Sequence, residues 1–186
     1  KFDDDEADIA VCLLSRSKVS KLPSDTTFLG LDYVSFDDDL SYDLYGLVGF
    51  PTEWTRDEEE VMAKGLQYIL PSFEGETATF SNYDPRSHIL LDSNSENTLD
   101  ENGFPPARPR SFRGISGTSI WRLFALTGPE PRRWQEGQAK IAAVGNSRYA
   151  RGRGIKGTRW GYVEELIRRE LPHLCPTFDL WRAGGL

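Results

Sequence analysis

Histidine, cysteine and long apolar runs are all scarce in this sequence. The 186 residues include only two cysteines and two histidines. Cys12 and Cys175 lie far apart, so there is no disulfide framework, and a reducing compartment such as the cytoplasm is favoured over secretion. Cys12 stands in an apolar run and is expected to be a buried thiol. These few residues show no metal-site spacing, and neither a metal nor another cofactor is expected.

The other absences concern membranes and basic charge. No apolar run approaches the ~18 residues that cross a bilayer, so no membrane partner is expected. The chain has 22 basic and 29 acidic residues and a net charge of −7. That balance argues against nucleic acid or an anionic membrane as the main partner. With 38% hydrophobic and 27% charged residues, the composition is typical of a soluble globular protein.

Short strand patterns separated by turn signals make up most of the chain. The expected strands are residues 9–14, 27–35, 45–50, 66–70, 77–80, 88–92, 119–125 and 139–145. Residues 56–64 could form a helical turn, whereas 93–113 and the basic, glycine-rich 148–157 read as loops. Residues 158–171 predict a helix with Thr158 as N-cap and Pro172 as its stop. The pattern predicts an all-β barrel or sandwich with a C-terminal helix.

The strongest chemical signal is Gly114-Ile115-Ser116-Gly117, which an apolar strand follows directly. Glycines around a serine let the backbone turn tightly, expose the hydroxyl and gather N–H groups in a small concavity. An acyl-transfer enzyme needs such a nucleophile beside donors for the developing oxyanion. By itself the motif could also be a plain glycine-serine turn. The Gly-x-Ser-x-Gly elbow is not matched, because Thr118 stands at its last position.

Several segments around this motif resemble trypsin-like serine peptidases of the chymotrypsin fold. Residues 8–14, Asp-Ile-Ala-Val-Cys-Leu-Leu, resemble the family's Asp-(Ile/Leu)-Ala-x-Leu segment, whose aspartate orients the catalytic histidine. Residues 47–51, Leu-Val-Gly-Phe-Pro, are similar to a Gly-Tyr-Pro strand end of bacterial members. Residues 140–145 are similar to the strand after the nucleophile, and 160–171 to the C-terminal helix. The chain thus resembles the C-terminal part of such a peptidase, of the bacterial intracellular type.

The resemblance implies an all-β, chymotrypsin-like double β-barrel in three parts. Residues 1–26 would end the first barrel and link the two, 27–157 would form the second barrel with the nucleophile loop, and 158–186 the C-terminal helix and tail. The implied activity is a serine endopeptidase acting on proteins or peptides. A regulatory protein partner is expected by analogy alone.

The resemblance also assigns roles to particular residues. Ser116 would be the nucleophile, Asp8 would orient the histidine, and the N–H groups of Gly114 and Ser116 would form the oxyanion hole. The implied substrate-binding residues are Arg110, Ala143, Val144 and Gly145. Arg110, six positions before Ser116, would lie at the floor of the primary specificity pocket and favour an acidic substrate residue.

The histidine is where the chain departs most from this family, whose order is His, Asp, Ser. His88 and His173 both follow Asp8. His88 is expected to be a structural strand residue, and His173 to complement a helix dipole. The base is therefore expected upstream of Lys1, and this chain alone is expected to be inactive and poorly soluble.

Two other readings stay open. Ile115 and Thr118 replace an aspartate and a glycine of many relatives. With the absent histidine, they allow an inactive, protease-like protein-binding module. A β-rich structural domain unrelated to peptidases is the third possibility.

Overall fold

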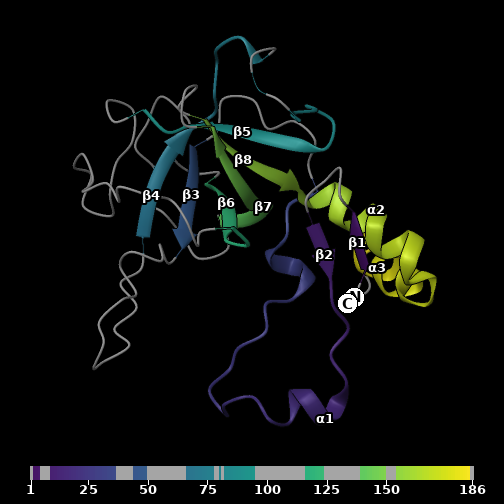
Figure 1. Cartoon of the computed structure of the whole chain (residues 1–186). Helices are drawn as coiled ribbons and strands as arrows, with labels where there is room; N and C mark the ends of the chain where they lie inside the picture. The colour runs from purple at the N-terminus through teal and green to yellow at the C-terminus, as the bar shows by residue number, and fades with distance from the viewer. Residues whose placement is uncertain are drawn as a thin grey trace.

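The computed structural model describes residues 2–4, 9–36, 44–49, 66–77, 80, 82–94, 116–123, 139–149 and 154–184. This part of the chain is mostly β, with a curled antiparallel sheet of six strands and a few helices at its C-terminal end (Figure 1). The expectation of an all-β architecture with a C-terminal helix is confirmed at this level. Within the described ranges, no helix is long and apolar enough to cross a membrane.

The six-stranded sheet has the order β4-β3-β6-β7-β8-β5. Its members are β3 (Leu44–Gly49), β4 (Leu66–Pro71), β5 (His88–Asp92), β6 (Ser119–Leu123), β7 (Ala139–Tyr149) and β8 (Gly154–Arg159). The two edge strands also meet, through an antiparallel bridge between Ser72 and Leu91. Beside it, the Phe73 N–H donates to the Leu90 carbonyl at 3.0 Å. The sheet therefore curls until its edges come together.

The concave face of this sheet holds the core. Strand residues alternate between the two faces, so β3 buries Tyr45 and Leu47 completely while Val48 stays 40% exposed. Tyr68, Leu70, Ile89, Leu91, Ile120, Ala142, Ala143 and Ile155 complete the core cluster. Burial of one face explains the alternation in β3 and β6, whereas β5 and β8 are buried on both faces.

Two sequence predictions for strands and loops are wrong. Residues 77–80 do not form a strand in the described part, because the Phe80 N–H closes a turn by donating to the Thr77 carbonyl at 3.0 Å. Residues 148–157 are not one loop, since β7 runs to Tyr149 and β8 begins at Gly154. Glycine suits β8, because a Cβ on Gly157 would lie 2.5 Å from Ile120 Cδ1. The expected helical turn at 56–64, and almost all of loop 93–113, lie outside the described residues.

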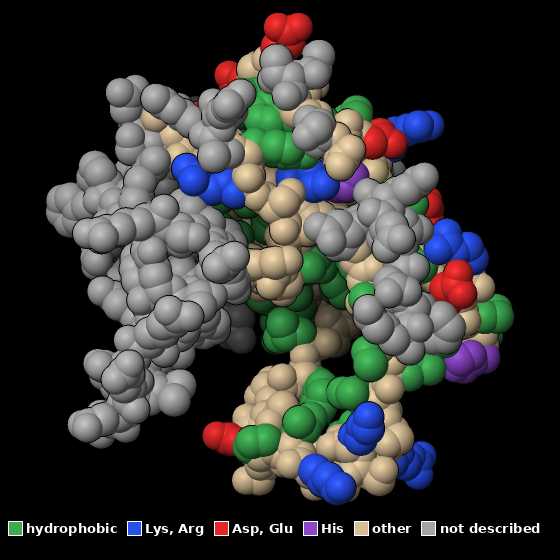
Figure 2. Space-filling model, in the orientation of Figure 1, with side chains coloured by type: hydrophobic (Ala, Val, Ile, Leu, Met, Phe, Trp, Pro, Cys, Tyr) green, Lys and Arg blue, Asp and Glu red, His purple; other side chains and the backbone are tan. Residues whose placement is uncertain are grey.

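The N-terminal segment is an arm beside the sheet. Strands β1 (Phe2–Asp4) and β2 (Ile9–Val11) pair in antiparallel fashion, and α1 (Arg16–Val19) follows. The predicted buried strand 9–14 is wrong past Val11, since Leu13 and Leu14 are 52% and 51% exposed. Cys12 is likewise exposed rather than buried. Figure 2 shows hydrophobic side chains at the surface of this arm, among basic side chains.

The second half of the arm also differs from the expected strand at 27–35. Phe28 is 60% exposed, and the only regular element is the 3-10 helix η1 (Leu31–Tyr33). The arm rejoins the sheet at Val34, which forms a parallel bridge with Ile141. The apolar residues of this segment therefore did not predict a buried strand correctly, because few described residues pack against the segment.

The helices follow β8 directly. They are α2 (Trp160–Glu170), η4 (Pro172–Leu174) and α3 (Cys175–Arg182). The predicted helix is confirmed, but its N-cap is Arg159, and Thr158 belongs to β8. Helix α2 contacts β2, β7 and β8. Its buried Glu164 accepts hydrogen bonds from Arg168 Nε at 2.7 Å and from Arg182 of α3 at 2.6 Å.

Candidate active site

Ser116 lies in a tight turn directly before β6 and is exposed. The next residue, Gly117, has a φ of +88°, a left-handed conformation that glycine adopts without strain. The turn is tied to β7, because the Gly117 N–H donates to the Gly145 carbonyl at 2.7 Å. The Gly145 N–H donates in turn to the Thr118 carbonyl at 2.8 Å. The serine hydroxyl is thus presented from a backbone that its neighbouring strand fixes.

The same contacts explain how the turn accommodates Thr118. A Cβ on Gly145 would lie 2.8 Å from Thr118 Oγ1, so the threonine side chain occupies space that only glycine leaves open. Within the described residues, Thr118 Oγ1 is buried and has no hydrogen-bond partner. A threonine at position 118, where many trypsin-like peptidases have glycine, is therefore compatible with the turn.

Three of the predicted site residues cannot be placed. Asp8, Gly114 and Arg110 lie outside the described residues. Their roles as histidine partner, oxyanion donor and specificity residue stay predictions.

The predicted substrate strand, Ala143, Val144 and Gly145, lies beside Ser116 but in the middle of the sheet. β6 or its preceding turn lies on one side of these residues and β8 on the other. Val144, for example, is opposite both Ser119 and Thr158. A peptide could add to β7 at these residues only if one of these neighbours moved away.

His88, the first residue of β5, is far from the serine along the sheet. His88 is opposite Thr158, Thr158 is opposite Val144, and Val144 is opposite Ser119. Three strand spacings, about 14 Å along the sheet, therefore separate His88 from the start of β6. With 2% exposure, His88 is a buried strand residue, as expected.

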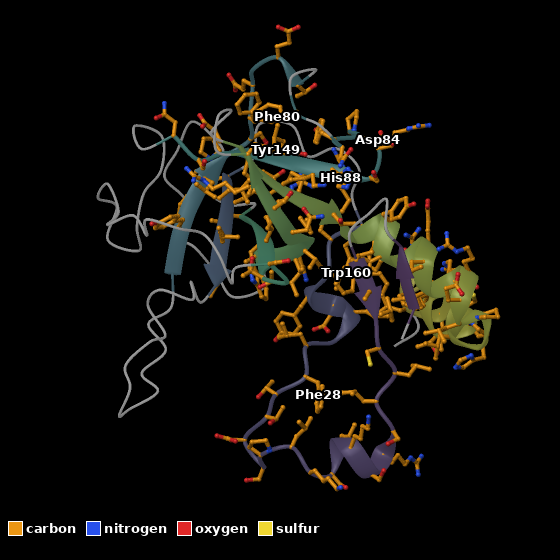
Figure 3. All side chains as sticks on the ribbon, viewed as in Figure 1. Phe28, Phe80, Asp84, His88, Tyr149 and Trp160 are labelled. Carbon is orange, nitrogen blue, oxygen red and sulfur yellow. The ribbon has the colours of Figure 1, made fainter. Side chains whose placement is uncertain are left out.

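His88 lies near Asp84 (Figure 3) and next to Ser87, so the residue types of a catalytic triad gather here, in an arrangement that differs from a triad. His88 Nδ1 lies 3.1 Å from Ser87 Oγ and accepts the backbone N–H of Asp84 at 3.2 Å. The Asp84 carboxylate instead accepts the Arg86 N–H at 2.9 Å, which lowers the pKa of Asp84. A triad needs the carboxylate on the histidine and an accessible serine, whereas Ser87 is 7% exposed. These contacts close the turn that precedes β5.

The other histidine, His173, is exposed in η4. It lies beyond α2, whose 11 residues extend about 16 Å from the end of β8. Of the two histidines, the sheet register thus separates His88 from Ser116, and no contact joins His173 to the serine turn among the described residues.

No protein-family model matches the chain, and no curated protein matches its sequence. Among the described residues, no group of three or more His, Cys, Asp or Glu side chains could hold a metal ion.

Sequence reasoning missed two features near the sheet. One is Lys156 of β8, which is 5% exposed. The other is a cavity of about 530 Å³ between residues 84–87, the end of β8 and α2. Its charged lining residues balance, since they are Asp84, Glu164, Glu165, Arg86, Arg159 and Arg168. The lining combines residues 84–87 with residues 159–168, so no local sequence pattern indicates the cavity.

Proposed function

We propose that this chain is the C-terminal part of a trypsin-like serine peptidase in which Ser116 is the nucleophile. The observation that carries the proposal is the exposed serine at a left-handed glycine turn, hydrogen-bonded to the neighbouring strand. A nucleophile that attacks a peptide carbonyl has to be accessible and held in place by its backbone.

The architecture supports the same proposal. Six antiparallel strands curl until the edges meet, and a helix follows the last strand, as expected of a second barrel from residues 27–157. The β1–β2 pair, which contacts α2 through β2, would belong to the end of a first barrel. The double barrel is part of the proposal.

The proposed reaction follows the acyl-enzyme route. Ser116 Oγ attacks the substrate carbonyl, and a histidine outside this chain accepts its proton, held in the correct tautomer by Asp8. The backbone N–H groups of Gly114 and Ser116 would stabilise the oxyanion. The histidine then gives the proton to the departing amine, and water hydrolyses the resulting ester.

Labelling with a fluorophosphonate probe tests this proposal on the protein expressed from its complete reading frame. The unaltered protein should be labelled, and Ser116→Ala should abolish labelling and lower turnover by about 10⁶-fold. Ser119→Ala is the matched control, because that hydroxyl accepts a hydrogen bond from Trp121 Nε1 at 2.7 Å and lies in β6. Ser119→Ala should keep its labelling. Proteolysis that persists in Ser116→Ala would refute the assignment.

A second candidate is an inactive protease-like module that binds proteins. The position of His88, three strands away from the start of β6, favours it. In that case the complete protein resists the probe, and peptides bind equally well to the unaltered protein and to Ser116→Ala.

A further inference from the structure

We propose that residues 12–30 of the arm, here called the arm loop, bind the surface of an anionic lipid bilayer. The inference goes beyond the proposed function and does not depend on the role of Ser116. It rests on the apolar and basic side chains that the arm loop exposes together.

The arm loop holds most of the large apolar side chains found at the surface. All of its residues, from 12 to 30, are exposed. Among the described residues, six of the eight exposed large hydrophobic side chains belong to it, namely Leu13, Leu14, Val19, Leu22, Phe28 and Leu29. The other two are Val48 of β3 and Leu180 of α3. Exposed apolar side chains that gather in one segment indicate an interaction surface.

The charge of the arm loop is opposite to that of the whole chain. The loop contains Arg16, Lys18 and Lys21 and a single acidic residue, Asp25, whereas the chain has a net charge of −7. Within the described ranges, none of the three basic side chains has an ion-pair or hydrogen-bond partner. Basic side chains of this kind are attracted to the negative surface of an anionic membrane.

The arm loop projects away from the six-stranded sheet. Figure 1 shows the chain leaving β2, reaching α1 at the far end and returning to the sheet. Hydrophobic and basic side chains lie at this end of the molecule in Figure 2, and Figure 3 places Phe28 there. Charges that are more than about 8 Å from a membrane are largely screened at physiological ionic strength. The net charge that argues against a membrane for the whole chain therefore opposes binding of this loop only weakly.

A bilayer suits the arm loop better than a protein surface does. The apolar side chains come from both limbs of the loop and from its tip, not from one face of a long helix or strand. Among the described residues, backbone hydrogen bonds of the loop join residues of the arm to one another, as from the Val19 N–H to the Ser15 carbonyl at 3.0 Å. Protein interfaces need closely matching shapes, whereas a fluid bilayer adapts to an irregular loop.

Each kind of side chain has a place at such a surface. The apolar side chains would enter the boundary between the headgroups and the acyl chains, as those of interfacial segments do. The ammonium and guanidinium groups would contact lipid phosphates and carboxylates. A second copy of the chain offers less, because contact between two arm loops brings like charges together.

Flotation with lipid vesicles tests the inference on the complete protein, because self-associated protein does not float. We expect flotation with vesicles of phosphatidylcholine and phosphatidylserine at low salt, and much less at high salt or with phosphatidylcholine alone. Lys18→Gln with Lys21→Gln should weaken binding by about thirtyfold. Phe28→Ser with Leu29→Ser should weaken it by about tenfold.

Arg86→Gln and Leu180→Ser are the matched controls. The Arg86 side chain is 91% exposed and Leu180 is 49% exposed, and both lie outside the arm. These two variants should float as the unaltered protein does.

Three outcomes would overturn the inference. The first is absence of flotation of the unaltered protein with phosphatidylserine vesicles. The second is flotation that neither pair of arm-loop substitutions weakens, because another surface would then bind the lipid. The third is a dimer that does not float and that Phe28→Ser with Leu29→Ser dissociates, which would assign the arm loop to a second copy of the chain.

Discussion

Replacement of Glu164 by glutamine should destabilise the protein by weakening the link between its two C-terminal helices, which Arg168 also joins through Asp179 of α3 at 2.8 Å. Glu164 is 4% exposed in α2 and accepts hydrogen bonds from Arg168 and Arg182 at 2.7 and 2.6 Å. Arg182 also lies over the Phe36 ring, 4.9 Å from its centroid, so the carboxylate links α2, α3 and the end of the arm. Glutamine keeps the shape of the side chain and removes its charge.

The magnitude follows from the two bonds and from the exposure of their donors. A hydrogen bond to a charged group contributes about 1.5–3 kcal/mol. The two arginine side chains are 30% and 50% exposed, so both keep contact with water after the change. The lower end of the range applies, which gives a loss of about 3 kcal/mol for the two bonds. For a chain of this size, Tm should fall by about 6–12 °C.

Urea unfolding of the complete protein, followed by tryptophan fluorescence, measures this loss. Arg169→Gln is the control, because its ion pair with Glu170 at 2.8 Å joins side chains that are 57% and 35% exposed. That pair should contribute less than about 1 kcal/mol. If Glu164→Gln costs no more than this control, the buried carboxylate does not hold the helices together.

Other variants and conditions test other parts of the structure. Gly117→Ala should cost about 1–2 kcal/mol and weaken probe labelling, since its φ of +88° strains any L side chain; unchanged urea unfolding would contradict this. Burial raises the pKa of Tyr83 and Tyr149, so unfolded tyrosines ionise first and stability falls as pH rises above about 10. Phenolate absorbance of the folded protein should therefore rise at higher pH than that of the unfolded protein. The isolated chain should be inactive and self-associate, and Leu14→Ser with Phe28→Ser should reduce association in sedimentation. A monomeric chain that hydrolyses peptides would contradict both expectations.

The sequence predicted those strands that are specified by an alternation of apolar and polar residues within the strand itself. Tyr45 and Leu47 alternate with less buried neighbours, and this alternation was enough to identify β3. β8 was missed because Lys156 and its glycines are typical of a loop. Those glycines are explained by residues distant in sequence, such as Leu90, whose Cδ1 would lie 2.8 Å from a Cβ on Gly154. No local pattern contains that contact.

In the candidate site, too, features set by neighbouring residues could be predicted and features set by residues distant in sequence could not. A tight, exposed turn at Ser116 could be predicted, because the glycine after it is a local signal. The burial of Lys156 could not, since it depends on the turn that brings Asn82 over β8. The sequence also failed to show that Val144 is enclosed by strands on both sides, which only the ladders reveal. On the arm the error was the reverse, because burial was predicted for Leu13 from its apolar side chain and Leu13 is exposed.

The strand order has a consequence for synthesis on the ribosome. Strand β5 pairs with β8, and Arg159 Nε donates to the His88 carbonyl across 71 positions of sequence. Strand β3 likewise lies between β4 and the much later β6. Pairings so distant in sequence form slowly. The growing chain can pair β3 with β4 at once, but one side of β3 and the ladder side of β5 wait for β6 and β8. A chaperone that shields these open strand sides until Arg159 has emerged should therefore raise the yield of folded protein.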